Sequence, residues 1–129
     1  MITVHSTSDK GRGVVATTAI EKGTLIERAP VASFPAEQRP IIDSTNIAKY
    51  YFVLPSEYKH NKHVNGHFVF GLLSLCNHSE VPNAYINWEQ DNVGLWAQLI
   101  ALQDIQKGQE VSLFYTNVDE YSFNSGVIS

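Results

Sequence analysis

The chain has 129 residues, which is the size of one domain. Hydrophobic residues make up 43% and charged residues 17%, a composition that excludes a disordered chain. Nine Lys and Arg stand against thirteen Asp and Glu, so the net charge is -4 and no direct nucleic-acid binding is expected. The single cysteine, Cys76, allows no intramolecular disulfide, and no apolar run reaches the length of a membrane helix. These features predict a reduced, cytoplasmic protein that does not contact a membrane.

Segments rich in β-branched and aromatic residues predict short strands along most of the chain. In chain order, these strands cover residues 14–17, 24–34, 83–88, 93–102 and 110–115. Pro30 and Pro35 place the end of the second strand at a sheet edge or a bend, because proline cannot donate to a ladder. The prediction is a mainly β fold.

One helix is expected between the second and third of these strands. Asp43 or Ser44 can cap its first turn, and apolar residues then recur at helical spacing. Pro55 is expected to end the helix, and the polar stretch 57–66 is expected to form a loop.

A short internal repeat links residues 20–26 to residues 105–111. Each copy has an apolar residue, a polar turn that ends in Lys-Gly, and then a new strand. Gly23 and Gly108 are expected to take the positive φ that such a turn requires. The repeat by itself indicates two similar turns and no function.

The first candidate site is the segment Lys10-Gly11-Arg12-Gly13, which comes just before the first predicted strand. Two glycines separated by one residue allow the backbone to approach a ligand without interference from Cβ atoms. The third glycine of a dinucleotide-binding fingerprint and the Gly-Lys-Ser/Thr ending of a P-loop are both missing. From the residues alone, a glycine-rich turn between strands remains the alternative.

The second candidate site follows an apolar run and crowds four hydrogen-bonding side chains into seven residues. These side chains belong to Asn77, His78, Ser79 and Asn83. The alternative is a turn with local bonds between side chains and backbone. Because the flanking run favours burial, the polar groups need partners, and a bound ligand is one option.

The third candidate is the last predicted strand, which alternates polar and apolar residues and ends at Tyr115. Alternation over 110–115 places the odd-numbered residues, including Leu113 and Tyr115, on one face. A core tyrosine with its hydroxyl near the surface is the alternative. The histidines His60, His63 and His67 lie in polar surroundings, and a zinc site normally needs four well-placed ligands, so no metal is expected.

In their order and spacing, these segments resemble the SET-domain family of protein lysine methyltransferases. The most specific part is Asn77-His78-Ser79-x-x-Pro82-Asn83, and Gly-x-Gly is the least specific. The resemblance covers residues 3–117 and implies one SET domain over residues 1–129, of the minimal, stand-alone bacterial or viral kind. It implies small curved sheets, one or two short helices, a C-terminal pseudoknot and a lid-like tail over 118–129.

The resemblance also implies the cofactor S-adenosylmethionine and assigns residues to its site. Tyr115 would be the catalytic residue. The residues expected to bind the cofactor are Lys10, Gly11, Arg12, Gly13, Asn77, His78 and Tyr115. The residues expected at the channel for the substrate lysine are Tyr51, Leu113, Tyr121 and Phe123. No residue is assigned to a metal.

The activity that the resemblance implies is methyl transfer to a lysine side chain of a protein substrate. The acidic balance favours a basic substrate, and a homodimer would complete the groove of so short a domain. A viral or secreted protein of this kind would act inside a host cell, including its nucleus. Many relatives carry a second tyrosine near the position of Ala29. Its absence leaves open the alternative of a weak or inactive module that binds cofactor or peptide as a scaffold.

Overall fold

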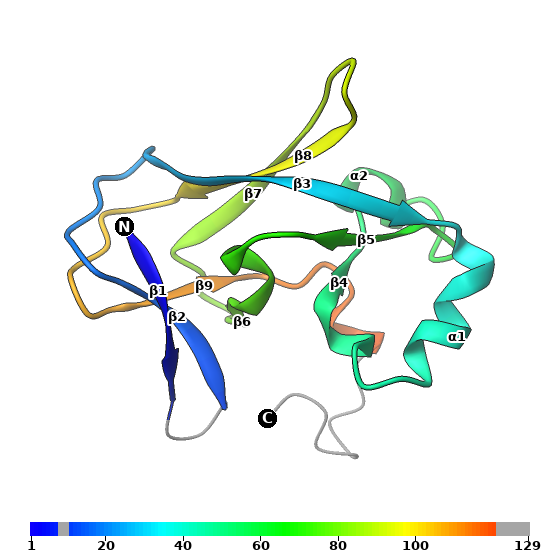
Figure 1. Cartoon of the computed structure of the whole chain (residues 1–129), viewed down its shortest axis with the longest axis horizontal. Coiled ribbons are helices and arrows are strands. Elements are labelled where there is room, and N and C mark those ends of the chain that lie inside the picture. Colours follow the sequence, from blue (N-terminus) through cyan, green and yellow to red (C-terminus); the bar gives the residue numbers. More distant parts are fainter. Residues whose placement is uncertain (8–10, 121–129) are drawn as a thin grey trace.

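The computed structural model describes residues 1–7 and 11–120, and strands dominate this part of the chain (Figure 1). The first sheet has the strand order β1-β2-β9-β6. Its strands are β1 (Ile2–Ser6), β2 (Arg12–Ala16), β9 (Glu110–Leu113) and β6 (Asn77–His78). The second sheet has the order β4-β5-β3-β8-β7. Its strands are β4 (Tyr51–Phe52), β5 (Gly66–Val69), β3 (Leu25–Phe34), β8 (Leu95–Ala101) and β7 (Ala84–Gln90). The predicted mainly β fold is confirmed, and the five predicted strands all form.

The helical elements of the described residues are short. The α-helices are α1 (Arg39–Asp43) and α2 (Pro55–Tyr58), and the 3-10 turns are η1 (Ala36–Gln38), η2 (Ala48–Tyr50), η3 (Leu72–Leu75) and η4 (Val118–Glu120). No helix in the described ranges combines the length and the apolar character needed to cross a membrane.

The predicted helix between Asp43 and Pro55 is wrong. Asp43 ends α1, and Pro55 begins α2, where its missing N–H would have had no helical partner anyway. Between them the chain forms η2 and then enters β4 at Tyr51, which pairs with β5. Residues 57–66 are only partly a loop, since α2 reaches Tyr58 and β5 begins at Gly66.

Strand β3 lies between β5 and β8 in the sheet order, but each half of it pairs with one neighbour only. The strand ends at Phe34, and Pro35 then leads into η1. Its first half, from Leu25 to Pro30, pairs with β8, and its second half, from Val31 to Phe34, pairs with β5. Pro30 lies where the partner changes, and its carbonyl accepts a hydrogen bond from the N–H of Phe70. A proline is tolerated there because one ladder ends before the other begins.

The main core collects buried side chains from both sheets. Val14 and Val111 come from the first sheet, Leu99 comes from the second, and Leu73 lies in η3; all four are fully buried. A smaller second cluster lies in the segment between β3 and β5. It contains Tyr51, Val53, Tyr58 and Val64. The segment 36–65 therefore has its own packing beside the main core.

The two copies of the internal repeat pair with each other. Ile20 and Ile105 form a β-bridge in which each N–H donates to the other carbonyl oxygen at 2.8 Å. Gly23 and Gly108 both have φ of 86°, as the sequence predicts. The repeat thus ties the chain between β2 and β3 to the chain between β8 and β9.

We expect Gly23→Ala to destabilise the fold by about 1–2 kcal/mol, because an alanine resists the left-handed conformation. No atom lies within 4 Å of the Cβ position, so the loss is conformational rather than steric. Urea unfolding measures it. Gly23→Asn is the control and should lose less, since asparagine tolerates positive φ. Equal losses in the two variants would contradict the explanation.

Candidate active site

The side-chain amide of Asn77 joins three strands of the first sheet. Its Nδ2 donates to the carbonyl oxygen of Arg12 in β2 at 3.0 Å and to Oε2 of Glu110 in β9 at 2.7 Å. Asn77 itself is in β6, which runs parallel to β9 and pairs with it. Both N–H groups of the amide are therefore used inside the protein, and the amide oxygen is the group that can accept from a ligand.

The imidazole of His78 fixes the backbone at Tyr115. The N–H of Tyr115 donates to Nδ1 of His78 at 2.9 Å. Because Nδ1 accepts, the ring proton of the neutral tautomer lies on Nε2, which is 3.2 Å from Oε1 of Glu80. The ring also lies 4.9 Å from that of Phe114 and 5.3 Å from that of Tyr115, centroid to centroid. His78 thus orients the segment that follows β9.

Asn83, a few residues further along the Asn-His segment, also binds β9 through its side chain. Its Nδ2 donates to the carbonyl oxygen of Glu110 at 2.8 Å, and its Oδ1 accepts from the N–H of Ser112 at 2.9 Å. The residue is 4% exposed, so these bonds satisfy a buried amide. The crowded polar residues of the Asn-His segment are therefore partnered mainly by β9 and its extension.

The two glycines of the Gly-x-Gly segment differ in what they do. Gly11 has φ of 75°, and a Cβ placed on it would meet nothing within 4 Å. A Cβ on Gly13 would lie 2.7 Å from Oε2 of Glu110 and 2.9 Å from Nδ2 of Asn77. A side chain at Gly13 would therefore press on the hydrogen-bonded pair Asn77 and Glu110, whereas no described residue crowds Gly11.

Tyr115 follows β9 and packs against the main core. Its hydroxyl donates to the carbonyl oxygen of Cys76 at 2.5 Å, so it points back toward the residue before β6. The predicted alternation of β9 holds for its described side chains: Val111 and Leu113 are buried, and Phe114 is half exposed. The Cys76 thiol is 1% exposed, and burial raises its pKa well above the ordinary value.

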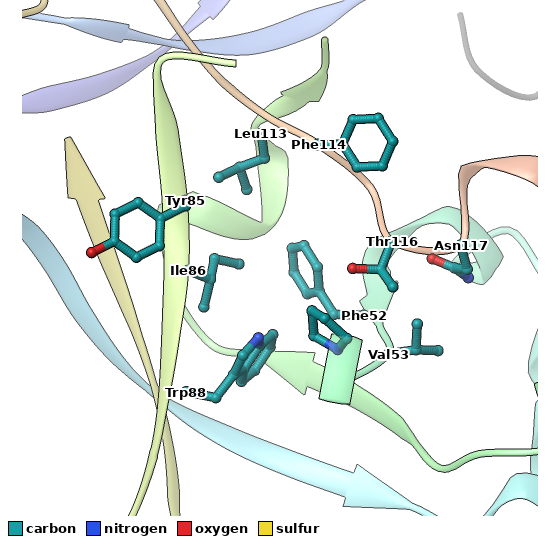
Figure 2. A pocket seen from close by; sticks show the side chains of 10 residues that line it. Phe52, Val53, Tyr85, Ile86, Trp88, Leu113, Phe114, Thr116 and Asn117 are labelled. Atoms are coloured by element: carbon teal, nitrogen blue, oxygen red, sulfur yellow. The ribbon is translucent and has the colours of Figure 1, made fainter. Parts of the chain in front are cut away.

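A pocket of about 120 Å³ lies beside the chain segment that leads to Tyr115 (Figure 2). One wall comes from β7, a second from β4 and the start of α2, and a third from the chain after Ser112. Its lining residues are Phe52, Val53, Pro55, Tyr85, Ile86, Trp88, Leu113, Phe114, Thr116 and Asn117. Figure 2 shows the side chains of Leu113, Ile86, Phe52 and Trp88 gathered around the same space. The walls are largely apolar and aromatic and carry no formal charge.

The structure brings together some of the predicted site residues and separates others. Leu113 lines the pocket, but Tyr51 does not: its ring is 4% exposed in the second cluster, and its hydroxyl donates to Asp43 Oδ1 at 2.7 Å. Burial raises the pKa of Tyr51 to about 12. Its neighbour Phe52 faces the pocket because adjacent residues of a strand point to opposite sides. Three predicted residues lie outside the described part of the chain: Lys10, Tyr121 and Phe123.

The histidines are not gathered into a metal site among the described residues. His67 is buried, with Nδ1 2.8 Å from the hydroxyl oxygen of Ser33 and its ring 6.0 Å from that of Trp88. Its Nε2 finds no hydrogen-bond partner in the described residues and lies 3.9 Å from Oε1 of Glu57. Burial lowers the pKa of His67, which favours the neutral ring.

Residues 11–116 match the family model of the SET domain. The chain belongs to the SET-domain family. It is 32% identical over 133 aligned residues to a Kluyveromyces lactis protein named as a histone-lysine N-methyltransferase specific for H3 lysine-36. A Debaryomyces hansenii protein of the same name is 29% identical over 132 residues. Each match covers 96% of this chain but only 18% and 17% of the relatives, so the chain spans less than a fifth of their length.

Solved structures of other proteins have a similar fold. A Plasmodium falciparum protein proposed to be a histone methyltransferase is 28% identical, with a TM-score of 0.68, and the match covers 88% of this chain and 91% of that one. A Neurospora SET-domain protein, a histone lysine methyltransferase, is 24% identical with a TM-score of 0.68, covering 94% and 53%. The SET fold expected from the sequence is confirmed. The threading of a pseudoknot stays a prediction, beside the observed parallel pairing of β6 with β9.

Sequence reasoning missed most of the pocket of this SET domain. Ile86 and Trp88 lie two residues apart in β7, and that spacing was a usable signal for one wall. Phe52 and Asn117 gave no such signal, because a mistaken helix covered the first and the second follows the last predicted strand. The absent second tyrosine also has a packing reason. Ala29 is buried against Gly71, where an added Cβ would come within 2.8 Å of the Ala29 Cβ.

Asn77→Asp is expected to destabilise the domain by about 1–3 kcal/mol at pH 7, because a carboxylate would replace the amide that donates to Glu110. Two carboxylates this close bind a proton more readily when folded than when unfolded. The loss should therefore shrink as the pH falls below about 5, since stability rises toward low pH when the folded state holds the extra proton.

Urea unfolding of the variant and the parent at pH 7 and at pH 4.5 makes the comparison. Asn77→Ala is the control: it loses the same bonds without adding a charge, and its loss should depend little on pH. A loss in Asn77→Asp that is the same at both pH values would show that Glu110 does not face the substituted group.

Proposed function

We propose that this SET domain transfers a methyl group from S-adenosylmethionine to a lysine side chain of a protein substrate. The observation that carries the proposal is the apolar pocket, which is lined by Leu113, Phe114 and Thr116 of the segment that contains Tyr115. His78 holds this segment through the N–H of Tyr115. The names of the relatives and the family membership support the same reaction. An apolar pocket with aromatic walls suits the alkyl stem of a lysine.

The residues present fit the cofactor. No described residue comes within 4 Å of the Cβ position at Gly11, the amide oxygen of Asn77 can accept from an ammonium group, and the exposed Arg12 suits a carboxylate. We assign cofactor binding to Gly11, Arg12, Gly13, Asn77 and His78 on this basis, with Tyr115 beside them. When bound, S-adenosylmethionine supplies a methyl group on a positively charged sulfonium.

The pocket prepares the substrate amine for attack. A free lysine has a pKa of about 10.4, so at neutral pH it must lose a proton before it can act as a nucleophile. Apolar walls such as Phe52 and Trp88 disfavour the charged ammonium and lower the pKa of an inserted lysine. The same rings tolerate a methylated ammonium through cation–π contact.

Tyr115 orients the amine. Its hydroxyl is held by the backbone oxygen of Cys76, and its own N–H is held by His78. A group fixed from two sides costs little reorganisation when it polarises a reacting nitrogen. Most of the rate enhancement would come from holding the amine in line, which is worth roughly 7–11 kcal/mol in well-oriented reactions.

The protein substrate is expected to be basic, because the chain has a net charge of -4 and opposite charge speeds encounter. A homodimer that completes the substrate groove stays a prediction, and sedimentation of the purified protein would test it.

Binding of S-adenosylmethionine or S-adenosylhomocysteine should stabilise the protein by about 2.7 kcal/mol at a hundredfold excess over Kd. Isothermal calorimetry and thermal unfolding measure this, with ATP as the control nucleotide. The absence of both binding heat and a thermal shift at millimolar cofactor would contradict the assigned site.

Tyr115→Phe should lower turnover by about 10²–10³, the effect of losing one oriented polar contact in the transition state. Affinity for the cofactor should change little, because the ring and its packing remain. The measurement is single-turnover methylation of histones or lysate proteins, with Tyr50→Phe as a control outside the pocket. Equal rates for the parent and Tyr115→Phe would refute the catalytic role, and a parent that binds cofactor but methylates nothing would favour an inactive module.

A further inference from the structure

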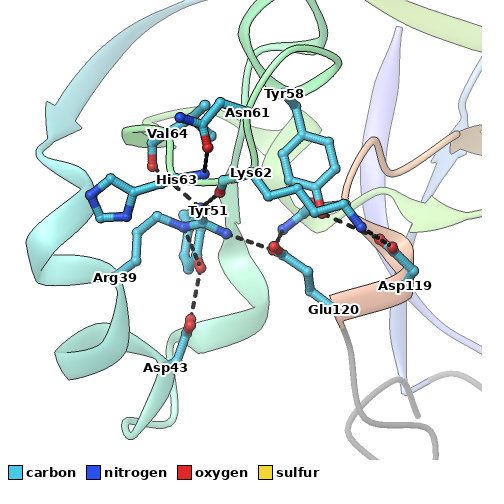
Figure 3. A network of polar contacts seen from close by, with 11 residues as sticks. Arg39, Asp43, Tyr51, Tyr58, Asn61, Lys62, His63, Val64, Asp119 and Glu120 are labelled. Carbon is cyan, nitrogen blue, oxygen red and sulfur yellow. Dashed lines mark hydrogen bonds and ion pairs between the residues drawn. The ribbon is translucent and has the colours of Figure 1, made fainter.

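A polar network joins the segment between β3 and β5 to the chain after β9 (Figure 3). At its centre is Arg39 in α1, which is 7% exposed. Its Nη2 lies 2.5 Å from Oε1 of Glu120 in η4, and Nη1 donates to the carbonyl oxygens of Lys62 and Val64 at 2.8 and 3.3 Å. A buried guanidinium with this many partners is held in one position.

The network reaches two walls of the pocket at once. On one side, Nε of Arg39 donates to the hydroxyl of Tyr51 at 3.2 Å, and the next residue, Phe52, lines the pocket. On the other side, Oε1 of Glu120 accepts a second hydrogen bond, at 3.0 Å, from Nδ2 of Asn117. Asn117 is 5% exposed and also lines the pocket. One carboxylate oxygen therefore connects Arg39 to a lining side chain.

A second ion pair joins the same two segments without touching the lining. Lys62 Nζ lies 3.0 Å from Oδ2 of Asp119, and both side chains are more than half exposed. Asp119 also accepts from the Tyr58 hydroxyl at 3.4 Å. An exposed pair of this kind contributes little energy. The structure thus offers two adjacent acidic residues, of which only Glu120 is bonded to a pocket residue.

We propose that Arg39 and Glu120 are positioning residues for the substrate lysine. They act through Asn117 and through Tyr51 to Phe52, and they fix the separation of the two pocket walls that these residues form. The inference rests on the proposed function, because it concerns the pocket assigned to the lysine. Breaking the Arg39–Glu120 contact should weaken the binding of the substrate side chain. It should leave the residues assigned to the cofactor, on and beside β2, β6 and β9, unchanged.

The test compares Glu120→Ala with Asp119→Ala, which removes a neighbouring carboxylate from the same 3-10 turn. The probe is a lysine-containing peptide of histone H3, titrated by calorimetry in the presence of S-adenosylhomocysteine and then used as a methylation substrate. Glu120→Ala should raise Kd and KM for the peptide about tenfold, with kcat and cofactor Kd within about twofold of the parent. Asp119→Ala should leave all four values near those of the parent.

Two further measurements separate positioning from loss of folding. Glu120→Gln keeps an oxygen that can accept from Arg39 and Asn117, so it should recover most of the peptide affinity. The side-chain amide signals of Asn117 in a ¹⁵N correlation spectrum should shift in Glu120→Ala and stay in place in Asp119→Ala. Thermal unfolding at the assay temperature shows that each variant is folded.

Each outcome decides the question. A peptide Kd in Glu120→Ala equal to that of the parent would overturn the positioning role, whether or not the Asn117 signals move. Equal weakening in Asp119→Ala, or no recovery in Glu120→Gln, would reduce the network to general stability and would also overturn it. A parent that binds the peptide but does not methylate it would refute the proposed function, and weaker binding by Glu120→Ala would then still support the role of the Arg39–Glu120 contact in holding the side chain. A parent that neither binds nor methylates the peptide would overturn both.

Discussion

The parallel pairing of β6 with β9 is the constraint on which the site depends. Asn77 and His78 form a strand of two residues, which could not persist on its two ladder partners alone. The side chains supply what the backbone cannot: the Asn77 amide bonds β2 and β9, and the His78 ring accepts from the N–H of Tyr115. The same few atoms therefore hold the first sheet together and orient the residue assigned to catalysis.

This arrangement explains why the Asn-His segment is so specific a signature. Both donors of the Asn77 amide are used internally, so an aspartate or a serine could not replace it even if no ligand were ever bound. Gly13 supports the same contact, because the absence of a Cβ atom leaves room for the side chains of Asn77 and Glu110. A motif of this kind encodes the fold first, and any ligand uses the one acceptor that remains.

The sequence predicted the parts of the fold that repeat a simple pattern. Alternation located β9 and its buried residues, and the Lys-Gly turns predicted positive φ at Gly23 and Gly108. Prediction from the sequence failed where an element is determined by contacts between residues far apart in the chain. The pairing of Tyr51 with Phe68 in β5 outweighed the helical spacing around it, and α1 ended at Asp43. Because a helix was predicted over these residues, the pocket wall from β4 was not predicted. No local pattern marks Phe52 as a lining residue.

The two halves of the site are held by different kinds of interaction. The half assigned to the cofactor is fixed by side-chain hydrogen bonds of Asn77 and His78, which reach the backbone of Arg12 and Tyr115 and the carboxylate of Glu110. The pocket half is joined across its walls by charge, through a buried guanidinium and one carboxylate. A partly buried pair is screened less than an exposed one, so the Arg39–Glu120 contact should keep more of its strength at ionic strengths that weaken the Lys62–Asp119 pair. The segment 36–65, with its own small core, is therefore tied to η4 by a contact that involves no residue of β2, β6 or β9. Separating the two halves in this way would allow the walls around the substrate to vary while the cofactor half stays the same.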